Sequence, residues 1–500
     1  MKKFVALFLS VLISLVLMSC GGKKNLHETG LIFDKEKYDS IPKKAVLATR
    51  AYENLPERVD LRPYAPYSGD QTSYRMCTAW ATTYGAMTTC ESIVLGRTDR
   101  GLSSQNVFSP FYLFRKCKPN DRSGRADGLS IEDALETLKA HGVPRQIAVD
   151  SQVDFSGFDL SMYNGQRLFK IADYATLFSS DADDAEKILA VKKSLSEKKP
   201  VVIGFYYYPL SFHRAGEIWN PSRWDRIEDG GHAMVIVAYD DTLQGGSFLF
   251  MNSWGRDWGS DGCTWVRYSD FARYTRGAYE MNSVLGVLTK ELKILHPLFL
   301  SEKEEPAPVK KSVVYKGEIS LPLAFENAGI AVRYEKGVYR SERSFESGDR
   351  FRICMTNTRP CYVYVFGSDE TSGKTSRLFP PEGTSALLDY SENPIVLPSE
   401  TEWIKLDDVQ GTDYLVILYS LKELNLDDIM SSYEKSVYTL GGDAGLLYSR
   451  VKESLGQENL ISLEKSEFAR SEINFSAWVN GDGSGDVGVL PILISIEHGN

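Results

Sequence analysis

The chain has 500 residues, which is more than one hydrophobic core usually organises, so we expect two or three domains. Hydrophobic residues make up 43% of it and charged residues 25%, both ordinary values for a globular protein. The formal net charge is -10 and the pI is about 5.4, so the protein offers no positive field to a nucleic acid. The composition therefore argues against a DNA or RNA partner.

The first twenty residues are typical of an export signal. Positive charge in MKK precedes the apolar run FVALFLSVLISLVLM, and a small residue stands before Cys20. LMSC resembles the lipobox of bacterial lipoproteins, whose cysteine is lipidated; a plain signal peptide is the alternative. The resemblance implies a signal over residues 1–19, a lipid on Cys20 and a membrane anchor. Because Gly21 follows, and not the aspartate that commonly retains lipoproteins at the inner membrane, it also implies a bacterial cell-envelope location at the outer membrane, on either face.

Residues 20–52 are short and charged, and we predict that they form a flexible tether before a domain at residues 53–295. Helical patterns come first in this domain and strand patterns later. The clearest are SIEDALETLKAHG from Ser130, DAEKILAVKKSLSEKK from Asp184, VVIGFYYY from Val201, HAMVIVAYD from His232, SFLFMNSW from Ser247 and CTWVRYSD from Cys263. Helices followed by strands indicate an α+β fold.

Proline and charged residues dominate HPLFLSEKEEPAPVKKS, which predicts a linker at residues 296–312. Residues 313–500 are rich in strand patterns with one or two helical stretches, which predicts a β-sandwich-like domain. From Ser344 onward this region resembles a β-rich domain family of unknown function that recurs on bacterial secreted chains. Two roles stay open for it: it binds an unknown partner or substrate, or it supports and spaces the first domain.

Cys77, in QTSYRMCTAWAT, is either a nucleophile or a packed thiol. A thiolate forms more readily at a helix N-terminus and beside an imidazolium, and the pattern after Cys77 places it at a helix start. Among the six histidines, His232 is the one that stands where a glycine turn meets an apolar strand. Asn252 ends another apolar strand and is placed to orient that ring, with Trp254 and Trp258 close by to exclude water.

Several segments, in the right order, resemble the papain-like cysteine peptidases. LPERVDLRP resembles the family's mature start, and QTSYRMCTAWA keeps the six-residue step from Gln71 to Cys77. HAMVIVAYD and MNSWGRDWGSDG resemble the family's histidine strand and asparagine segment. The 155 residues from Cys77 to His232 are a little beyond the spacing of about 130–150 expected for this arrangement. The resemblance covers about residues 53–290.

The resemblance implies a papain-like fold with two lobes, one helical and one β-barrel-like, and hydrolysis of peptide bonds through a thioester. It implies that Cys77 is the nucleophile, that His232 is the general base and then the general acid, and that Asn252 orients His232. Gln71 and the backbone N–H of Cys77 would bind the oxyanion. Peptide or protein substrates and no cofactor follow from the same resemblance.

The chain departs from the family pattern in several places. Residues 72–76 replace a Gly-Ser-Cys-Gly-Ser stretch, Thr78 stands where a tryptophan usually follows the nucleophile, and Leu129 replaces the second of two paired glycines. The region before Leu55 is too short for an independent inhibitory fold, so we expect no zymogen control. Two rival hypotheses remain: a catalytically silent scaffold or binding lipoprotein, and acyl transfer to an amine through the same residues.

Two other motifs carry weaker signals. NGDGSGD, residues 480–486, spaces oxygen ligands like a calcium loop, but Pro491 stands where the twelfth position needs a bidentate glutamate. A hairpin turn explains this stretch better, so we predict no metal site. Cys354 and Cys361 flank a short loop between strand patterns and either form a disulfide or stay reduced.

Overall fold

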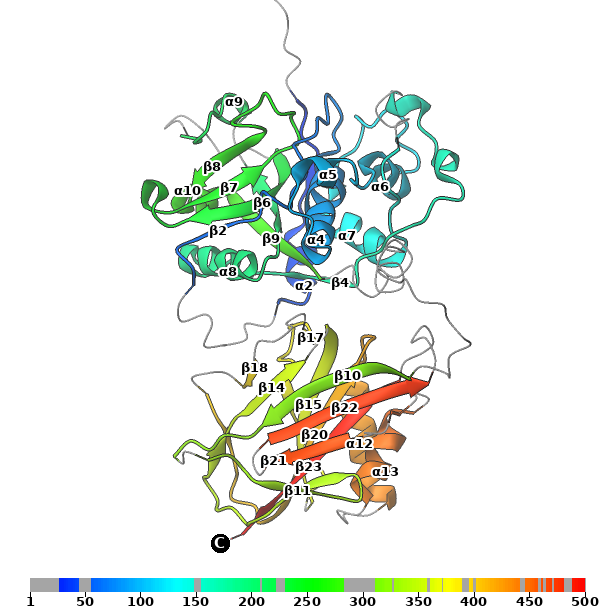
Figure 1. Cartoon of the computed structure of the whole chain (residues 1–500), viewed down its shortest axis with the longest axis vertical. Helices are drawn as coiled ribbons and strands as arrows, with labels where there is room; N and C mark the ends of the chain where they lie inside the picture. Colours follow the sequence, from blue (N-terminus) through cyan, green and yellow to red (C-terminus); the bar gives the residue numbers. More distant parts are fainter. Residues whose placement is uncertain are drawn as a thin grey trace, which may run out of the picture.

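The computed structural model contains two folded regions, which lie one above the other in Figure 1. The described residues are 27–44, 55–147, 154–206, 209–221, 230–282, 311–325, 328–357, 360–370, 372–388, 395–398, 402–440, 446–456, 460–461, 465–469, 472–480 and 488–499. The predicted signal at residues 1–19, Cys20 and most of the predicted linker lie outside them. Within these ranges no helix is long and apolar enough to cross a membrane.

A nine-stranded sheet organises the N-terminal region. Its main path is β3-β1-β6-β5-β9-β4, and β6 also pairs with β2 and with β7, which in turn pairs with β8. The strands are β1 (Leu31–Ile32), β2 (Arg58–Asp60), β3 (Leu129–Ser130), β4 (Asp173–Thr176), β5 (Val201–Tyr206), β6 (Gly231–Asp240), β7 (Ser247–Met251), β8 (Cys263–Arg267) and β9 (Thr275–Asn282). Because β6 pairs with four neighbours, it is the central strand of this region.

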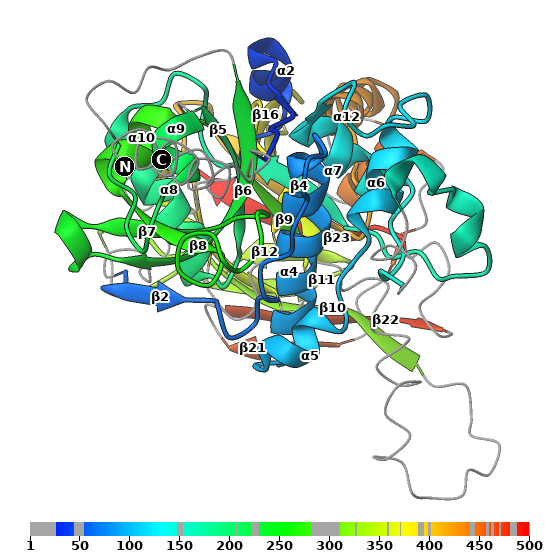
Figure 2. The same ribbon diagram turned by 90° about the horizontal axis from the view of Figure 1, so that it is seen from above.

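Helices of the N-terminal region lie on both sides of β6, in the view of Figure 2. They are α2 (Lys35–Ser40), α3 (Cys77–Ala79), the π-helical segment Trp80–Met87, α4 (Thr88–Val94), α5 (Arg100–Ser104), α6 (Pro110–Cys117), α7 (Ile131–Ala140), α8 (Asp184–Ser196), α9 (Pro209–His213) and α10 (Tyr268–Tyr274). Figure 2 shows α4 to α7 on one side of β6 and the strands β7 and β8 on the other. The region therefore has a helical lobe and a strand-rich lobe.

Most elements of this region occur where the sequence predicts them, with the expected caps. The hydroxyl of Ser130 accepts a hydrogen bond from the Asp133 N–H at the start of α7, and Gly142 (φ 77°) follows its end. Asp183 caps α8 in the same way. The predicted strands are β5 to β8. These elements confirm the α+β prediction.

The described residues of the C-terminal region form two main sheets and two helices. The five-stranded sheet has the order β18-β14-β10-β22-β21, and the seven-stranded sheet follows β11-β12-β23-β20-β15-β16 with β17 beside β15. The strands and helices are β10 (Lys311–Ser320), β11 (Val332–Glu335), β12 (Val338–Ser341), β13 (Arg350–Phe351), β14 (Ile353–Asn357), β15 (Cys361–Asp369), β16 (Thr375–Phe379), β17 (Leu387–Leu388), β18 (Ile395–Leu397), β19 (Ile404–Lys405), β20 (Gly411–Ser420), α12 (Leu426–Leu440), α13 (Leu447–Ser454), β21 (Lys465–Ala469), β22 (Glu472–Asn480) and β23 (Leu490–His498).

The core of the C-terminal region lies between its two sheets. Alternate residues of β15 and β20, such as Val363 and Ile417, pack in one cluster with Ile353 and Phe475 of the other sheet. The intervening residues point to the opposite face, where α12 and α13 cover them. This arrangement confirms the predicted β-sandwich with one or two helices.

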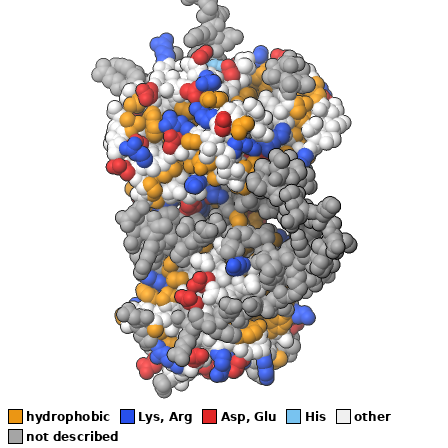
Figure 3. All heavy atoms as spheres, viewed as in Figure 1, with side chains coloured by type: hydrophobic (Ala, Val, Ile, Leu, Met, Phe, Trp, Pro, Cys, Tyr) orange, Lys and Arg blue, Asp and Glu red, His pale blue; other side chains and the backbone are white. Residues whose placement is uncertain are grey.

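Charges and cysteines add little constraint to this architecture. The face drawn in Figure 3 mixes acidic, basic and hydrophobic side chains. No disulfide joins cysteines in the described part of the chain, so Cys354 and Cys361 are not bonded to each other in the structure.

Residues 27–44 differ from the flexible tether that we predicted. β1 enters the sheet between β3 and β6, and α2 packs against the same domain. Tyr38 of α2 is fully buried, and its hydroxyl donates a hydrogen bond to the Phe178 carbonyl at 2.6 Å. Leu31 and Ile41 are also buried. These three apolar side chains anchor the segment, although charged residues separate them in the sequence.

Candidate active site

Cys77 begins α3 and is fully buried beneath residues of both lobes. The helix continues without a break through the π-helical segment into α4, so the N-terminus of a long helix lies at the sulfur. A helix N-terminus stabilises negative charge, which favours the thiolate form of a cysteine placed there. The Gly30 N–H donates to the Cys77 Sγ at 3.3 Å.

His232 stands at the start of β6, on the other lobe. Its Nε2 atom is 2.6 Å from Oδ1 of Asn252, which follows β7. The indole of Trp254 stacks on the imidazole, with ring centroids 4.8 Å apart and planes inclined by 25°. The amide therefore orients the ring and the indole covers it, as the sequence predicts for both residues. Trp258 packs edge-on against Trp254, behind the imidazole.

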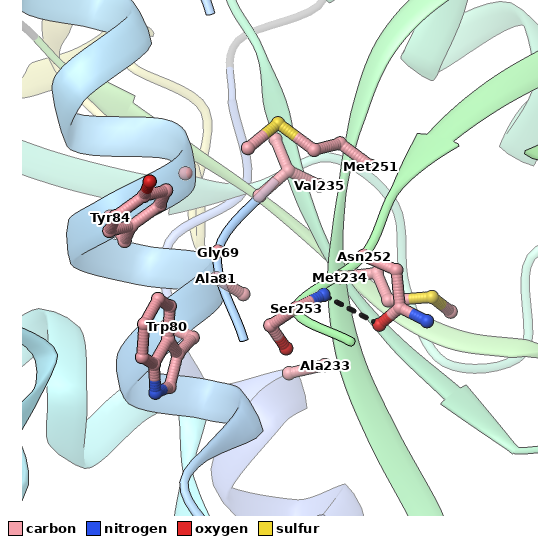
Figure 4. Close-up of a pocket in the computed structure, with 11 residues that line it drawn as sticks. Gly69, Trp80, Ala81, Tyr84, Ala233, Met234, Val235, Met251, Asn252 and Ser253 are labelled. Atoms are coloured by element: carbon pink, nitrogen blue, oxygen red, sulfur yellow. Dashed lines mark hydrogen bonds between the residues drawn. The ribbon is translucent and has the colours of Figure 1, made fainter. Parts of the chain in front are cut away.

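Gln71 and Asn252 are connected through Ser253. The Ser253 hydroxyl donates to Oε1 of Gln71 at 2.6 Å, and the Ser253 N–H donates to Oδ1 of Asn252 at 2.8 Å. Figure 4 shows the second bond, at the edge of a cavity of about 10 Å³ between the helix after Cys77 and the strands β6 and β7. A space of this size holds about one water molecule, so the two lobes are closely packed beneath the site.

Gly85 allows this close packing. A Cβ atom built on Gly85 would lie 2.8 Å from Cγ2 of Val235 in β6. Any larger residue would push the helix that carries Cys77 away from the strand that carries His232.

Residues 28–31 fill the cleft between the lobes. The Gln71 amide nitrogen donates to the Glu28 carbonyl at 2.8 Å, next to the bond from Gly30 to Cys77 Sγ. Leu31 pairs with Leu129 of β3 on one side and with Gly231 of β6 on the other. The chain's own backbone therefore lies between the two lobes, directly against Cys77 and Gln71. We expected no zymogen control because the region before Leu55 is too short for an independent fold, yet a short segment of that region lies against Cys77 and Gln71.

Residues 28–31 can lie against Cys77 only because residue 30 is a glycine. A Cβ atom at Gly30 would lie 2.2 Å from the Arg75 carbonyl oxygen and 2.7 Å from the Arg75 Cβ. The clash would involve backbone, which cannot move aside as a flexible side chain does. At this point the segment presents the Gly30 N–H to the sulfur.

Burial controls the protonation of both candidate catalytic groups. It raises the pKa of the Cys77 thiol, although backbone hydrogen bonds from Ala233, Gly30 and Thr78 act in the opposite direction. It lowers the pKa of His232 to about 3, against a smaller rise from the Asn252 hydrogen bond. In the covered cleft both groups are therefore neutral at pH 7, in contrast to a thiolate–imidazolium pair.

Residues 55–284 match the family model described as papain family cysteine protease. The matched residues form a papain-family domain. It contains Cys77, His232, Asn252 and Gln71. The match spans both lobes and ends before the C-terminal region begins.

Individual proteins show more distant likeness. An uncharacterized peptidase C1-like protein of Acanthamoeba polyphaga mimivirus is 22% identical over 48% of this chain and 77% of its own length. Xylellain, a cysteine protease from Xylella fastidiosa, is similar at 22% identity with a TM-score of 0.40, over 52% of this chain and 97% of its own. A procathepsin B from Trypanosoma congolense is similar at 17% identity with a TM-score of 0.40, over 53% and 90%.

The substitutions that depart from the family pattern have visible structural roles. The Thr78 hydroxyl, where a tryptophan is usual, donates to the Leu129 carbonyl at 2.7 Å and so connects α3 to β3. Leu129 in turn pairs with Leu31 of the covering segment. Sequence reasoning missed the roles of Gly30, Leu31 and Ser253. The apolar run that begins at Gly30 in a polar stretch was the available signal.

We expect Gly30→Ala to uncover Cys77. The added methyl group meets the Arg75 backbone, so residues 28–31 can no longer lie against the sulfur. Alkylation of Cys77 by iodoacetamide at pH 7.5, followed by peptide mass spectrometry, should become at least about tenfold faster than in the wild type. The control is Gly157→Ala, because a Cβ there meets nothing within 4 Å. Equal rates in the two variants would show that the segment does not protect the thiol.

We also expect acid to loosen the covering segment. Burial lowers the pKa of His232 to about 3 and that of His213, which also stacks on Trp254, to about 4, whereas a solvated histidine titrates near 6.5. An open state binds protons more readily between those values, so falling pH favours opening, and the closed state is most favoured above about pH 6.5.

Hydrogen exchange of residues 28–32 tests this prediction, after correction for intrinsic rates. Protection should fall by about tenfold or more between pH 7 and pH 4. Protection in α7 serves as the internal reference. A constant ratio of the two would contradict the argument.

Proposed function

We propose that this protein is a cysteine peptidase that hydrolyses peptide bonds through Cys77, His232, Asn252 and Gln71, and that its own residues 28–31 keep it latent. The observation that carries the proposal is the 2.6 Å contact between His232 and Asn252 beside the helix that begins at Cys77, within a papain-family domain. The substrates are peptides or proteins. Nothing in the fold favours a catalytically silent scaffold.

The proposed reaction begins when the covering segment has left the cleft. His232 accepts the Cys77 proton, and the sulfur attacks the carbonyl carbon of the peptide bond. The Gln71 amide and the Cys77 N–H donate to the oxyanion; Gln71 already donates to the Glu28 carbonyl in the closed form. His232 then protonates the departing amine, which leaves a thioester on Cys77. Water, deprotonated by His232, hydrolyses the thioester and restores the thiol.

Position in the cell is part of the proposal. LMSC before Gly21 supports a lipid on Cys20, export, and attachment to the outer membrane of a bacterial envelope. A lipid anchor at Cys20 would precede the covering segment by only a few residues. Substrates would then be envelope or nearby extracellular polypeptides. Mass spectrometry of the mature N-terminal peptide tests this: a diacylglyceryl mass on Cys20 is expected, and an unmodified cysteine would contradict it.

The catalytic assignment is tested best in the uncovered chain. On folded Gly30→Ala protein, a thiol-directed epoxide should add one mass increment that Cys77→Ala removes. Once the desolvating segment has left, the thiol pKa should lie well below the value of about 8.5 for a free cysteine, so labelling should stay fast at mildly acidic pH. His232→Ala should abolish this low-pH reactivity. An adduct that persists in Cys77→Ala, or a thiol midpoint near the free value, would contradict the assignment.

Product analysis separates hydrolysis from acyl transfer. Gly30→Ala protein is incubated with a peptide library, with and without an added amine. We expect free carboxylate products in both cases. Predominant amide products with the amine would instead assign a transferase.

A further inference from the structure

Residues 28–31, which cover Cys77, belong to the longer segment 27–44. A buried ionic cluster lies at the C-terminal end of this longer segment. The Lys44 ammonium is 2.7 Å from Oε2 of Glu280 and 2.5 Å from Oε2 of Glu197. The exposed fractions of the three side chains are 17%, 2% and 11%. The Ser194 hydroxyl also donates to Glu280. Buried charges persist only when paired, so this cluster is a specific binding site for the Lys44 ammonium.

The C-terminal domain closes the same cluster from the other side. Ser385 and Leu387 line a cavity of about 10 Å³ together with Lys44, Glu197 and Glu280. The catalytic domain and the C-terminal domain therefore both contribute to the site that holds Lys44.

The backbone on either side of Lys44 pairs with both domains. The Lys44 N–H donates to the Thr176 carbonyl of β4 at 2.7 Å. The Lys43 N–H donates to the Gly383 carbonyl at 2.8 Å, and the Ser385 N–H donates to the Lys43 carbonyl at 2.8 Å. Residues 42–44 thus lie between the edge strand of the catalytic sheet and a loop of the C-terminal domain.

We propose that Lys44, bound by Glu197 and Glu280 beneath residues 383–387, locks residues 27–44 across the cleft, so that the C-terminal domain holds the peptidase closed. The lock depends on the proposed function in one respect only, namely that the covered site is a peptidase site. It assigns the C-terminal domain a ligand within its own chain.

The electrostatics of the cluster favour retention of the segment. Without Lys44, two buried carboxylates would face each other. Burial raises the pKa of Glu197 against the opposing effect of Lys44, and with the added effect of the neighbouring Glu280 charge this pKa is about 7. If Lys44 left at neutral pH, the carboxylates of Glu197 and Glu280 would therefore repel each other strongly. Only the entry of water or protons could relieve this repulsion.

The lock is connected to the cleft by a short, anchored stretch. α2 begins three residues after β1 and ends four residues before Lys44. Its fully buried Tyr38 fixes the middle of the segment to the catalytic domain. Release at Lys44 frees the end at which α2 leaves the domain, so the segment is then held by its buried apolar side chains and by the contacts of α2 with Asp133 and Ser180.

The first test uses two adjacent lysines in the full-length chain. Lys43 is exposed, whereas Lys44 is bound in the cluster, so Lys44→Gln and Lys43→Gln change net charge equally. The readout is the rate of Cys77 alkylation by iodoacetamide, measured by peptide mass spectrometry. We expect at least about a tenfold increase for Lys44→Gln and no change for Lys43→Gln. Lys44→Arg, which keeps the charge, should stay close to wild type.

A second pair of variants tests the contribution of the C-terminal domain. Ser385→Pro removes the N–H that donates to Lys43, whereas Ser385→Ala keeps it. Only the proline variant should speed Cys77 alkylation.

If Lys44→Gln fails to give a cooperative thermal transition, Glu280→Gln, which removes one carboxylate and keeps the ammonium, replaces it.

The outcomes separate the lock from the proposed function. Equal alkylation rates for Lys44→Gln and Lys43→Gln, or for Ser385→Pro and Ser385→Ala, would overturn the lock. Faster alkylation without peptide cleavage would leave the lock standing and refute the peptidase proposal, because alkylation measures only access to the sulfur.

Discussion

The close approach of one helix to one strand is the constraint on which the N-terminal domain depends. The helix that begins at Cys77 carries the sulfur, and β6 carries His232, so their separation decides whether proton transfer can occur. Gly85 permits the approach, since a Cβ there would meet Val235. Ser253 then connects Gln71 of the helical lobe to Asn252 of the other lobe. The site is thus formed by the packing of two lobes, and neither lobe contains it alone.

The same packing explains why a short segment of the chain can cover the site. β1 is only two residues long, yet it pairs with both lobes at the point where they meet. Backbone pairing on two sides compensates for its small size, and Leu31 fills the space left by Gly204 and Gly231. Covering the cleft also removes water from Cys77 and His232, which favours their neutral forms. One contact surface therefore both covers the two side chains and favours their neutral forms.

The sequence predicted those elements and site residues whose signals lie within a few neighbouring residues. α7 and α8 carry their caps within a few residues, and β5 to β8 are continuous apolar runs, so their positions follow from short patterns. His232 and Asn252 were found because each stands at a strand end, and the structure brings them together. Cys77 was placed correctly at a helix start.

The covering segment could not be predicted because its stability is not local. The Leu31 strand pairs with residues about 100 and 200 positions away, and Lys44 is bound by two glutamates from separate elements. Composition marked residues 20–52 as a charged tether, yet the side chain of Lys44, one of those charges, is only 17% exposed. From sequence alone a lysine is expected to be solvent-exposed, unless its carboxylate partners are known. The contact between the second domain and this segment is seen only when those partners and the backbone of residues 383–385 are considered together.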